Sequence, residues 1–270
     1  MPFSANTLLI VGAGASNEIG FPMGSDLKDR IRACTNIEWN GIELTGDKEF
    51  CALAEDYART RGGQVSPILE ACKHIHSNVL LSGSIDEFLS SHQEDETIVA
   101  CAKIAIALEI SRAERGSHLN ENSLARDNTD FAYLKDTYLP RLWARLQNGE
   151  SISNWTSFFD GLKIVTFNYD RVLEQFFSLA LQRFCRVGAP EAAEFVSSLP
   201  MLHVYGSLGN LHSRAGEFCG FAPDMAAGIA EQPVGGARII DHGTSREVFV
   251  GALHIGGWRD KVSALVQRCI

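Results

Sequence analysis

Residues 8–22 read "LLIVGAGASNEIGFP", an apolar run that leads directly into a glycine-rich turn. In the dinucleotide-binding fingerprint, the first, third and sixth positions of such a turn are glycine. Gly12 and Gly14 fit this spacing, but the sixth position is Asn17 and the next glycine is Gly20. The stretch indicates a strand followed by a sharp turn. It leaves three interpretations open: an altered Rossmann loop, a different phosphate loop, or a turn without a ligand.

The turn has the physical properties of a phosphate-binding loop. Glycine lets a ligand approach the backbone closely, and this applies to Gly12 and Gly14. The amides that follow lie at or near a helix N-terminus and can point at a pyrophosphate; they belong to Ala13, Gly14, Ala15 and Ser16. The hydroxyl of Ser16 adds a further donor. A strand-to-helix turn with no ligand accounts for the same residues equally well.

Net charge and cysteine spacing argue against two classes of protein, those that bind nucleic acid through bulk charge and those with a zinc ribbon. A formal net charge of −9 argues against a protein that binds nucleic acid through bulk electrostatics. The closest two of the seven cysteines are 17 positions apart, so the chain has no CxxC pair and no zinc ribbon. We therefore expect no metal, and cysteines that act as small buried apolar groups.

The cysteine count, the N-terminal residues and the apolar stretches together predict where in the cell the protein is located. An odd number of cysteines, and an N-terminus without a basic start or a cleavage signature, are typical of a reducing cytoplasm. The most apolar helix-like stretch, 98–110, contains Lys103 and Glu109 and is too short to span a bilayer. We therefore expect a soluble cytoplasmic protein that has no membrane partner.

Apolar patterns along the chain predict an α/β fold. Short apolar runs typical of buried parallel strands lie at 8–11, 163–167, 201–205 and 237–240. Helices are expected after Ser25 and over 47–60, 66–81, 84–92, 96–115, 129–147, 171–184 and 258–269, with a loop at 116–128. The pattern predicts a Rossmann-like parallel sheet in residues 1–45 and 150–270, with a large helical insertion, 46–149, after the first strand.

Polar residues follow the second predicted strand, in "KIVTFNYDRVLEQFF" at 163–177. Side chains alternate along a strand, so Thr166, Asn168 and Asp170 point the same way at its carboxyl end. An amide beside a carboxylate suits recognition of ribose hydroxyls or a carboxamide. The alternatives are that Asp170 is the N-cap of the next helix and that Asn168 is a turn residue.

The third predicted strand carries a histidine, in "MLHVYGSLGNL" at 201–211. His203 lies inside an apolar run, and Gly206 and Ser207 follow it. A lone histidine in such a run is more often a hydrogen-bonded core residue than a catalyst. A neutral imidazole with a lowered pKa could nevertheless act as a base near pH 7.

Taken together and in this order, the three stretches resemble the sirtuin superfamily. "GAGASNEIGFP" is similar to the sirtuin cofactor loop, in which Gly20 and Pro22 are the later members. "TFNYD" resembles the sirtuin "TQNID" signature, and "HVYGS" resembles the segment with the catalytic histidine. "SIDEFLSSH" and "FNYDRVLEQ" look like the sirtuin-like proteins of bacterial antiphage defence.

The resemblance implies NAD⁺ as the substrate, hydrolysed to nicotinamide and ADP-ribose as a defence by NAD⁺ depletion. It implies that Asn168 positions the ribose hydroxyls or the attacking water and that His203 is the general base. It also implies cofactor contacts from the pyrophosphate loop and the nicotinamide pocket: Gly12, Ala13, Gly14, Ala15, Ser16, Gly20, Pro22, Thr166, Asp170, Gly206 and Ser207.

The chain also departs from the sirtuin pattern. A sirtuin deacetylase has a four-cysteine zinc module after its histidine, whereas here only Cys219 and Cys269 follow His203, which argues against protein deacetylation. In many relatives histidine directly precedes the glycine, but here Tyr205 precedes Gly206, so the register of the catalytic residue stays open. Near the C-terminus, 242–248 resembles the sirtuin segment that contacts ribose, whereas 248–262 could instead supply the last strand, glycine turn and helix, and both interpretations stay open.

Other classes of function remain. The chain could be a non-catalytic NAD⁺ or ADP-ribose sensor, or an interaction subunit of a defence complex with a helicase, nuclease or Argonaute-like partner. In the interaction subunit, enzyme activity is expected to stay silent until it is triggered. We expect either a homo-oligomer or a complex with such a partner. An ordinary Rossmann oxidoreductase fits least well, because the sixth-position glycine and an acidic residue after a second strand are both missing.

Overall fold

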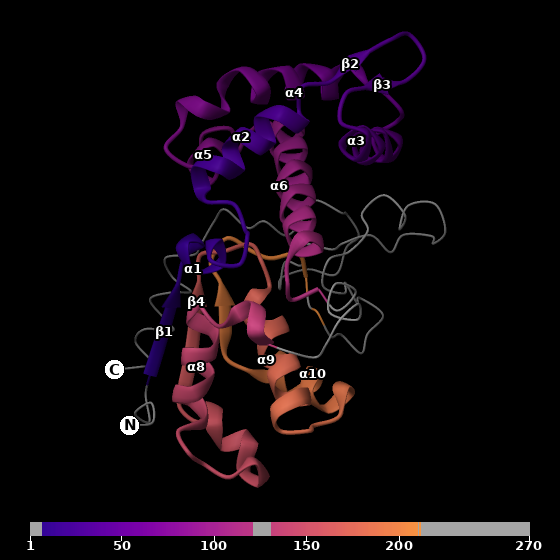
Figure 1. Ribbon diagram of the computed structural model, residues 1–270. Coiled ribbons are helices and arrows are strands. Elements are labelled where there is room, and N and C mark those ends of the chain that lie inside the picture. Colours follow the sequence, from indigo (N-terminus) through magenta and orange to yellow (C-terminus); the bar gives the residue numbers. More distant parts are fainter. Residues whose placement is uncertain (1–6, 121–130, 210, 212–270) are drawn as a thin grey trace.

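The computed structural model describes residues 7–120, 131–209 and 211, and shows a mixed α/β fold (Figure 1). Three parallel strands form a sheet in the order β1-β4-β5: β1 (Thr7–Val11), β4 (Leu162–Thr166) and β5 (Met201–His203). Their register pairs Val11 with Thr166, and Thr166 with His203. The strands predicted at 8–11, 163–167 and 201–205 are confirmed, with ends shifted by one or two residues. The strand predicted at 237–240 lies outside the described residues.

Helices that surround this sheet form the lower part of Figure 1. They are α1 (Ala13–Asn17), α8 (Tyr138–Gln147), α9 (Val172–Phe184) and α10 (Ala189–Ser198), with 3-10 turns η2 (Phe131–Leu134) and η3 (Ile152–Phe159). The helix predicted at 171–184 is therefore confirmed as α9, and it is buried along most of its length. Trp143 of α8 packs edge-on against Phe176 of α9, which holds these two helices together beside the sheet.

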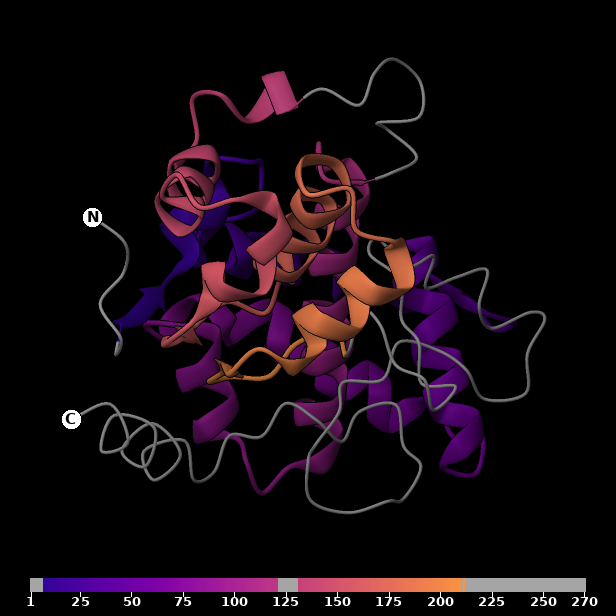
Figure 2. The same ribbon diagram turned by 90° about the horizontal axis from the view of Figure 1, so that it is seen from below.

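A second group of helices lies above the sheet in Figure 1, and behind it in the view from below in Figure 2. It contains α2 (Gly24–Cys34), α3 (Lys48–Thr60), α4 (Ser66–Asn78), η1 (Val79–Leu81), α5 (Ile85–Ser91) and α6 (Glu96–Gly116), with a small hairpin of β2 (Glu38–Trp39) and β3 (Leu44–Thr45). The helix α6 is buried on nearly every side, as expected of a central helix, and the other four α-helices of this group pack on it.

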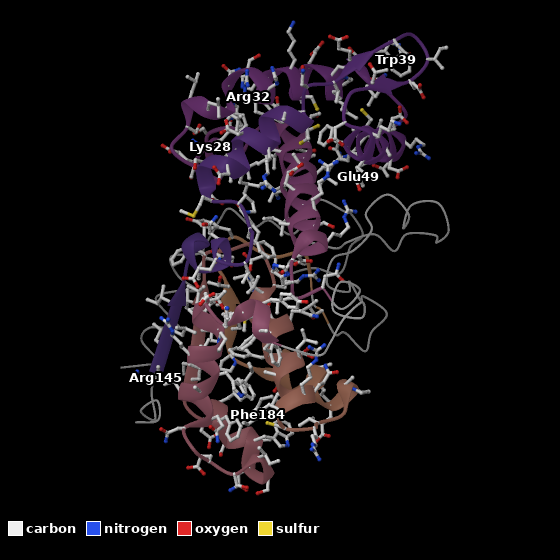
Figure 3. The ribbon with its side chains drawn as sticks, viewed as in Figure 1. Lys28, Arg32, Trp39, Glu49, Arg145 and Phe184 are labelled. Atoms are coloured by element: carbon white, nitrogen blue, oxygen red, sulfur yellow. The ribbon has the colours of Figure 1, made fainter. Side chains whose placement is uncertain are left out.

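Ion pairs fasten α3 to the central helix. Arg112 of α6 binds Asp47 and Glu49 at 2.7 Å each, and Arg115 binds Glu49 at 2.7 Å. Figure 3 shows Glu49 on α3, which lies beside α6. Asp47 also accepts a hydrogen bond from the amide of Phe50 and so caps the helix predicted at 47–60.

Several elements differ from the sequence predictions. The helix predicted at 129–147 is two elements, because the side chain of Thr137 accepts a hydrogen bond from the Leu139 amide and starts a new helix there. The helix predicted after Ser25 begins two residues earlier than expected, at Gly24, with Met23 as its N-cap. The turn η3, the helix α10 and the hairpin β2–β3 were not predicted.

The two groups of helices do not follow the predicted boundaries at residues 46 and 149. The helix α2, inside 1–45, packs on α4, α5 and α6, whereas α8, inside 46–149, lies beside the sheet (Figure 1). The division of the chain into two domains stays a prediction.

The described residues contain five of the seven cysteines. The five cysteines there are unpaired and buried, as predicted: Cys34, Cys51, Cys72, Cys101 and Cys185. Within residues 7–120 and 131–209, no helix has the length and apolar character needed to cross a membrane.

Candidate functional site

The candidate site lies where β1 and β4 end. The two strands are parallel neighbours, so their carboxyl ends meet at one edge of the sheet. The amide of Phe167 still donates to the carbonyl of Val11 at 2.9 Å, which keeps the chains together as they leave the sheet. The glycine-rich turn follows β1 and the "FNYD" segment follows β4, so both predicted motifs lie at this edge.

Asn168 joins the two motifs directly. Its Nδ2 atom donates to the carbonyl oxygen of Gly12 at 3.2 Å and to Oγ of Ser16 at 2.9 Å. Its backbone amide donates to Oγ1 of Thr166 at 3.1 Å. The side chain is buried. Residues more than 150 positions apart are thus held in one hydrogen-bonded group.

Asp170 lies in the same group and is only 7% exposed. Its Oδ1 atom accepts a hydrogen bond from the amide of Val172 at 3.2 Å, so it satisfies the first turn of α9 as a capping residue would. Burial raises the pKa of its carboxyl from 3.8 to about 7, and a hydrogen bond from the Ser16 hydroxyl opposes this rise. The Asp170 side chain therefore fits both interpretations of its role, as a cap of α9 and as a ligand contact.

His203 contacts this group from β5. Its Nδ1 atom lies 3.0 Å from the carbonyl oxygen of Asn168, and its Nε2 atom lies 2.7 Å from Oε1 of Glu174. Burial alone would lower the pKa of His203, but the carboxylate of Glu174 outweighs it and raises that pKa. The charge of His203 in turn lowers the pKa of Glu174, against the effect of burial. Both ring nitrogens face acceptors, so both hold protons. To act as a base, the ring has to give up the proton on Nε2.

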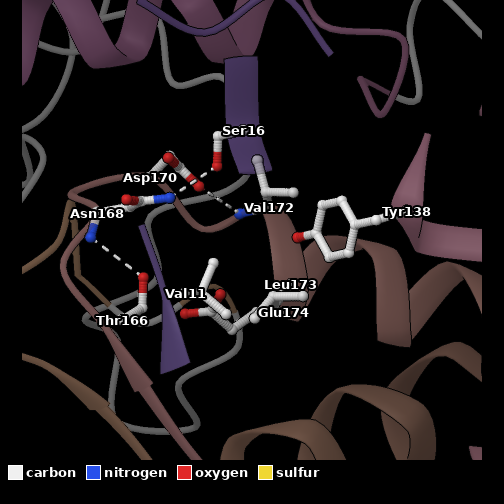
Figure 4. Close-up of a pocket in the computed structure, with 9 residues that line it drawn as sticks. All are labelled: Val11, Ser16, Tyr138, Thr166, Asn168, Asp170, Val172, Leu173 and Glu174. Atoms are coloured by element: carbon white, nitrogen blue, oxygen red, sulfur yellow. Dashed lines mark hydrogen bonds between the residues drawn. The ribbon is translucent and has the colours of Figure 1, made fainter. Parts of the chain in front are cut away.

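A small cavity opens among these residues (Figure 4). Its polar walls come from Ser16, Tyr138, Thr166, Asn168, Asp170 and Glu174, and its apolar walls from Val11, Val172 and Leu173. The centre of a water molecule can reach about 10 Å³ of this cavity, so the cavity holds roughly one water. Tyr138 and Glu174 were missed from the sequence. Helical spacing alone does not show which polar residue of a helix turns toward the end of a sheet.

The other predicted cofactor residues take different places. The loop residues Gly12, Ala13, Gly14 and Ala15 are exposed or half-buried at the start of α1 and are not among the residues that line the cavity. Gly20 and Pro22 end that turn, and Gly20 has a φ of +93°, so the turn itself requires glycine there. Gly206 and Ser207 follow β5 and are not among the residues that line the cavity.

A buried ion pair fixes the backbone beside Asp170. The guanidinium of Arg171 donates to both carboxylate oxygens of Glu114, from Nε at 3.1 Å and from Nη2 at 2.6 Å. The two side chains are 1% and 0% exposed. Arg171 also donates to the carbonyl oxygen of Gly209 at 3.4 Å. One side chain therefore connects α6, the site segment and the loop after β5.

Comparison of the chain with family models, with curated proteins and with solved structures gave no match. In the described part of the chain, no three histidine, cysteine or acidic side chains gather closely enough to hold a metal ion.

The raised pKa of Asp170 predicts a pH-dependent stability. The folded state binds the proton up to pH 7 and the unfolded state only up to about pH 4, so Asp170 stabilises the fold below its unfolded pKa. We expect that stabilisation to be lost as the pH rises from 4 to 7, by at most about 4 kcal/mol. In Asp170→Asn this loss should be absent, which denaturant unfolding at pH 5 and pH 8 would measure.

Asp160→Asn, at an exposed position, is the matched control and should keep the wild-type pH dependence. The pKa of His203 is also raised, and this adds a loss of stability in the same direction above pH 6.5; its main raising cause, Glu174, is present in all three proteins, and Asp170 contributes less to it. Equal pH dependence in wild type and Asp170→Asn would contradict the prediction.

Proposed function

We propose that the protein is an NAD⁺ glycohydrolase of the sirtuin-like type, which cleaves the bond between nicotinamide and ribose. One observation carries the proposal. Asn168, Gly12 and Ser16, from the two motifs that resemble the sirtuin cofactor site, are hydrogen-bonded to one another beside a polar cavity. The cavity lies at the carboxyl ends of neighbouring parallel strands, where α/β sheets bind nucleotides.

The pyrophosphate is assigned to the exposed side of the glycine-rich turn. Gly12 has an ordinary extended backbone with a φ of −131°, and Gly14 is helical. A Cβ atom added to either residue would meet no other atom within 4 Å. The fold itself therefore does not require glycine at these two positions. A ligand that lies against the backbone would explain why both positions are glycine.

The carboxylates supply the electrostatics of the reaction. Departure of nicotinamide leaves positive charge on the ribose ring. Glu174 places negative charge at the cavity, and Asp170 adds to it when ionised, above its raised pKa of about 7. Water attacks C1′ of the ribose and the C1′–N bond breaks. NAD⁺ and water thus give nicotinamide, ADP-ribose and one proton. Asn168 orients the ribose or the water. His203 is the candidate general base, and it can take up the proton only after it has given up the proton on Nε2, which faces Glu174.

The proposal includes the wider setting implied by the resemblance. The described sheet would be part of a Rossmann-like domain, and residues 46–149 its helical insertion. The protein would act in the cytoplasm in antiphage defence, as a homo-oligomer or with a helicase, nuclease or Argonaute-like partner.

The direct test is incubation of the purified protein with NAD⁺, with nicotinamide and ADP-ribose separated by chromatography. Equal amounts of the two products are expected. The assay is run alone and with candidate activators, because the activity of a defence enzyme is expected to be gated. Binding of NAD⁺ that never releases nicotinamide under any of these conditions would contradict hydrolysis.

A second candidate function is a non-catalytic module that binds NAD⁺ or ADP-ribose. The observation that favours it is the state of His203, whose two ring nitrogens both face acceptors. In that arrangement the ring is held as a structural cation. Calorimetric binding of NAD⁺ without turnover, measured on the same sample as the product assay, selects this function.

Gly14→Ala separates ligand binding from folding. Alanine is favoured over glycine inside a helix by about 0.5–1 kcal/mol, and the added methyl group has free space. We expect unchanged or slightly higher thermal stability and at least a tenfold weaker affinity for NAD⁺, since the methyl group enters the pyrophosphate position.

The control for Gly14→Ala is Gly188→Ala, at the start of α10. Gly188 is exposed, has a φ of −62° and has no atom within 4 Å of an added Cβ. Its affinity for NAD⁺ should equal that of the wild type. If Gly14→Ala also binds like the wild type, the ligand does not lie on the turn.

A further inference from the structure

Tyr138 brings a hydroxyl group into the site from outside the sirtuin-like motifs. It is the first residue of α8 and lines the cavity. Figure 4 shows its hydroxyl pointing toward the other lining residues. The oxygen is shielded from solvent and has no hydrogen-bond partner among the described residues. A buried hydroxyl without a partner costs about 1–3 kcal/mol, so such groups in native proteins call for an explanation.

A second unpaired polar atom lies in the wall of the same cavity. The Oδ1 atom of Asn168 is buried and has no partner among the described residues. Both hydrogens of its Nδ2 atom are used, by Gly12 and Ser16, which fixes the orientation of the amide. In Figure 4 the Oδ1 oxygen lies on the side of the amide that faces away from Tyr138, so a single bound oxygen does not bridge the two atoms. The hydroxyl of Tyr138 is therefore the unpaired group that points into the cavity and can bind a water or a ligand hydroxyl.

Tyr138 remains protonated in this position. Burial raises the pKa of its hydroxyl well above the usual value, and the nearby carboxylates of Asp170, Glu18 and Glu174 raise it further. Titration to the phenolate is therefore suppressed, and the group is available as a donor over the physiological pH range.

The glycine-rich turn holds Tyr138 in place. The backbone amide of Tyr138 donates to Oε2 of Glu18 at 2.8 Å, and Glu18 lies directly after α1. Thr137 satisfies the next amide of the helix by accepting from Leu139. The start of α8 is therefore tied to the turn assigned to the pyrophosphate, although the two are 120 residues apart.

We infer that Tyr138 binds the hydroxyl oxygen that enters the cavity during the reaction. This oxygen belongs either to the attacking water or to a hydroxyl of the ribose that carries nicotinamide. The inference rests on the proposed function. The size of the cavity supports it, because the space accepts about one water or one hydroxyl group and no nicotinamide ring.

Tyr138→Phe tests the inference because it removes a single oxygen. Thermal stability without ligand should equal or exceed that of the wild type, since an unpaired buried hydroxyl is lost. If the oxygen is that of water, kcat falls at least tenfold and the dissociation constant of ADP-ribose is unchanged. If it belongs to ribose, the dissociation constants of NAD⁺ and ADP-ribose rise about tenfold.

Tyr133→Phe is the matched control, because Tyr133 is 52% exposed and stacks on His118. It should leave both constants unchanged. Glu18→Gln is a second variant, which weakens the hydrogen bond that anchors the start of α8 and leaves the Tyr138 ring intact. It should change the same constant as Tyr138→Phe, in the same direction and by a smaller factor. An active wild type with unchanged kcat and binding in Tyr138→Phe overturns this inference alone. A wild type that neither binds nor cleaves NAD⁺ overturns the proposed function, and this inference with it.

Discussion

Asn168→Ala is expected to lower the rate of NAD⁺ cleavage at least 100-fold, a loss typical of removing one positioned polar group from a transition state. The reason is geometric. The amide binds Gly12 and Ser16 through Nδ2 and lines the cavity, so its removal breaks the junction of the two motifs at the site. Nicotinamide release by the two proteins at equal concentration measures the effect.

The loss of two buried hydrogen bonds also costs Asn168→Ala about 1–3 kcal/mol of stability. The matched control is Asn78→Ala. It removes a hydrogen bond from a side-chain amide to the carbonyl oxygen of His74, at 2.8 Å, in the helical group. This variant should keep the wild-type rate. A folded Asn168→Ala that cleaves NAD⁺ at the wild-type rate would show that the amide has no part in the chemistry.

Glu114→Ala is expected to give the largest loss of stability, about 3–5 kcal/mol in the free energy of unfolding. It leaves the guanidinium of Arg171 charged, buried and without its two carboxylate acceptors. Denaturant titration measures the loss. Because Arg171 directly follows Asp170 and also contacts Gly209, the same variant should disturb the site and weaken NAD⁺ binding.

Two comparisons separate this ion pair from ordinary surface charge. The double variant Glu114→Leu with Arg171→Met replaces the pair by apolar side chains and should recover most of the lost stability. Glu96→Ala removes the partner of Arg61 in an exposed pair, where Glu96 is 79% exposed, and should cost less than about 1 kcal/mol. If Glu114→Ala costs as little as Glu96→Ala, the buried pair does not fix the fold at this position.

Much of the described fold could be predicted from local sequence. The apolar run before Gly12 and the run 163–167 are short, continuous and flanked by turn residues, which is enough to identify β1 and β4. Asp47 and Ser84 mark helix starts because their side chains accept hydrogen bonds from backbone amides of the first turn. The hairpin β2–β3 was missed because two-residue strands have no periodic pattern.

The site was only partly predictable. Asn168 and Asp170 follow an obvious strand, and the carboxyl end of such a strand is where α/β sheets bind ligands. Both residues lie beyond Thr166, the last residue of β4, so strand alternation does not set their directions. Tyr138 and Glu174 reach the cavity from helices, and their direction depends on how α8 and α9 pack against the sheet. The partner of Arg171 lies 57 positions away in α6, and no local pattern in the sequence connects them.

The pairing of β1 with β4 also has a consequence for biosynthesis. Thr7 pairs with Leu162, so the first strand has to wait until 155 further residues have been made. At roughly 5–20 residues per second this takes roughly 10–30 s. During that time Ile10, which is 64% exposed even in the finished fold, lies on a strand without its neighbour. Any chain released from the ribosome before β4 lacks Asn168 and, with it, the amide on which the proposed hydrolysis depends.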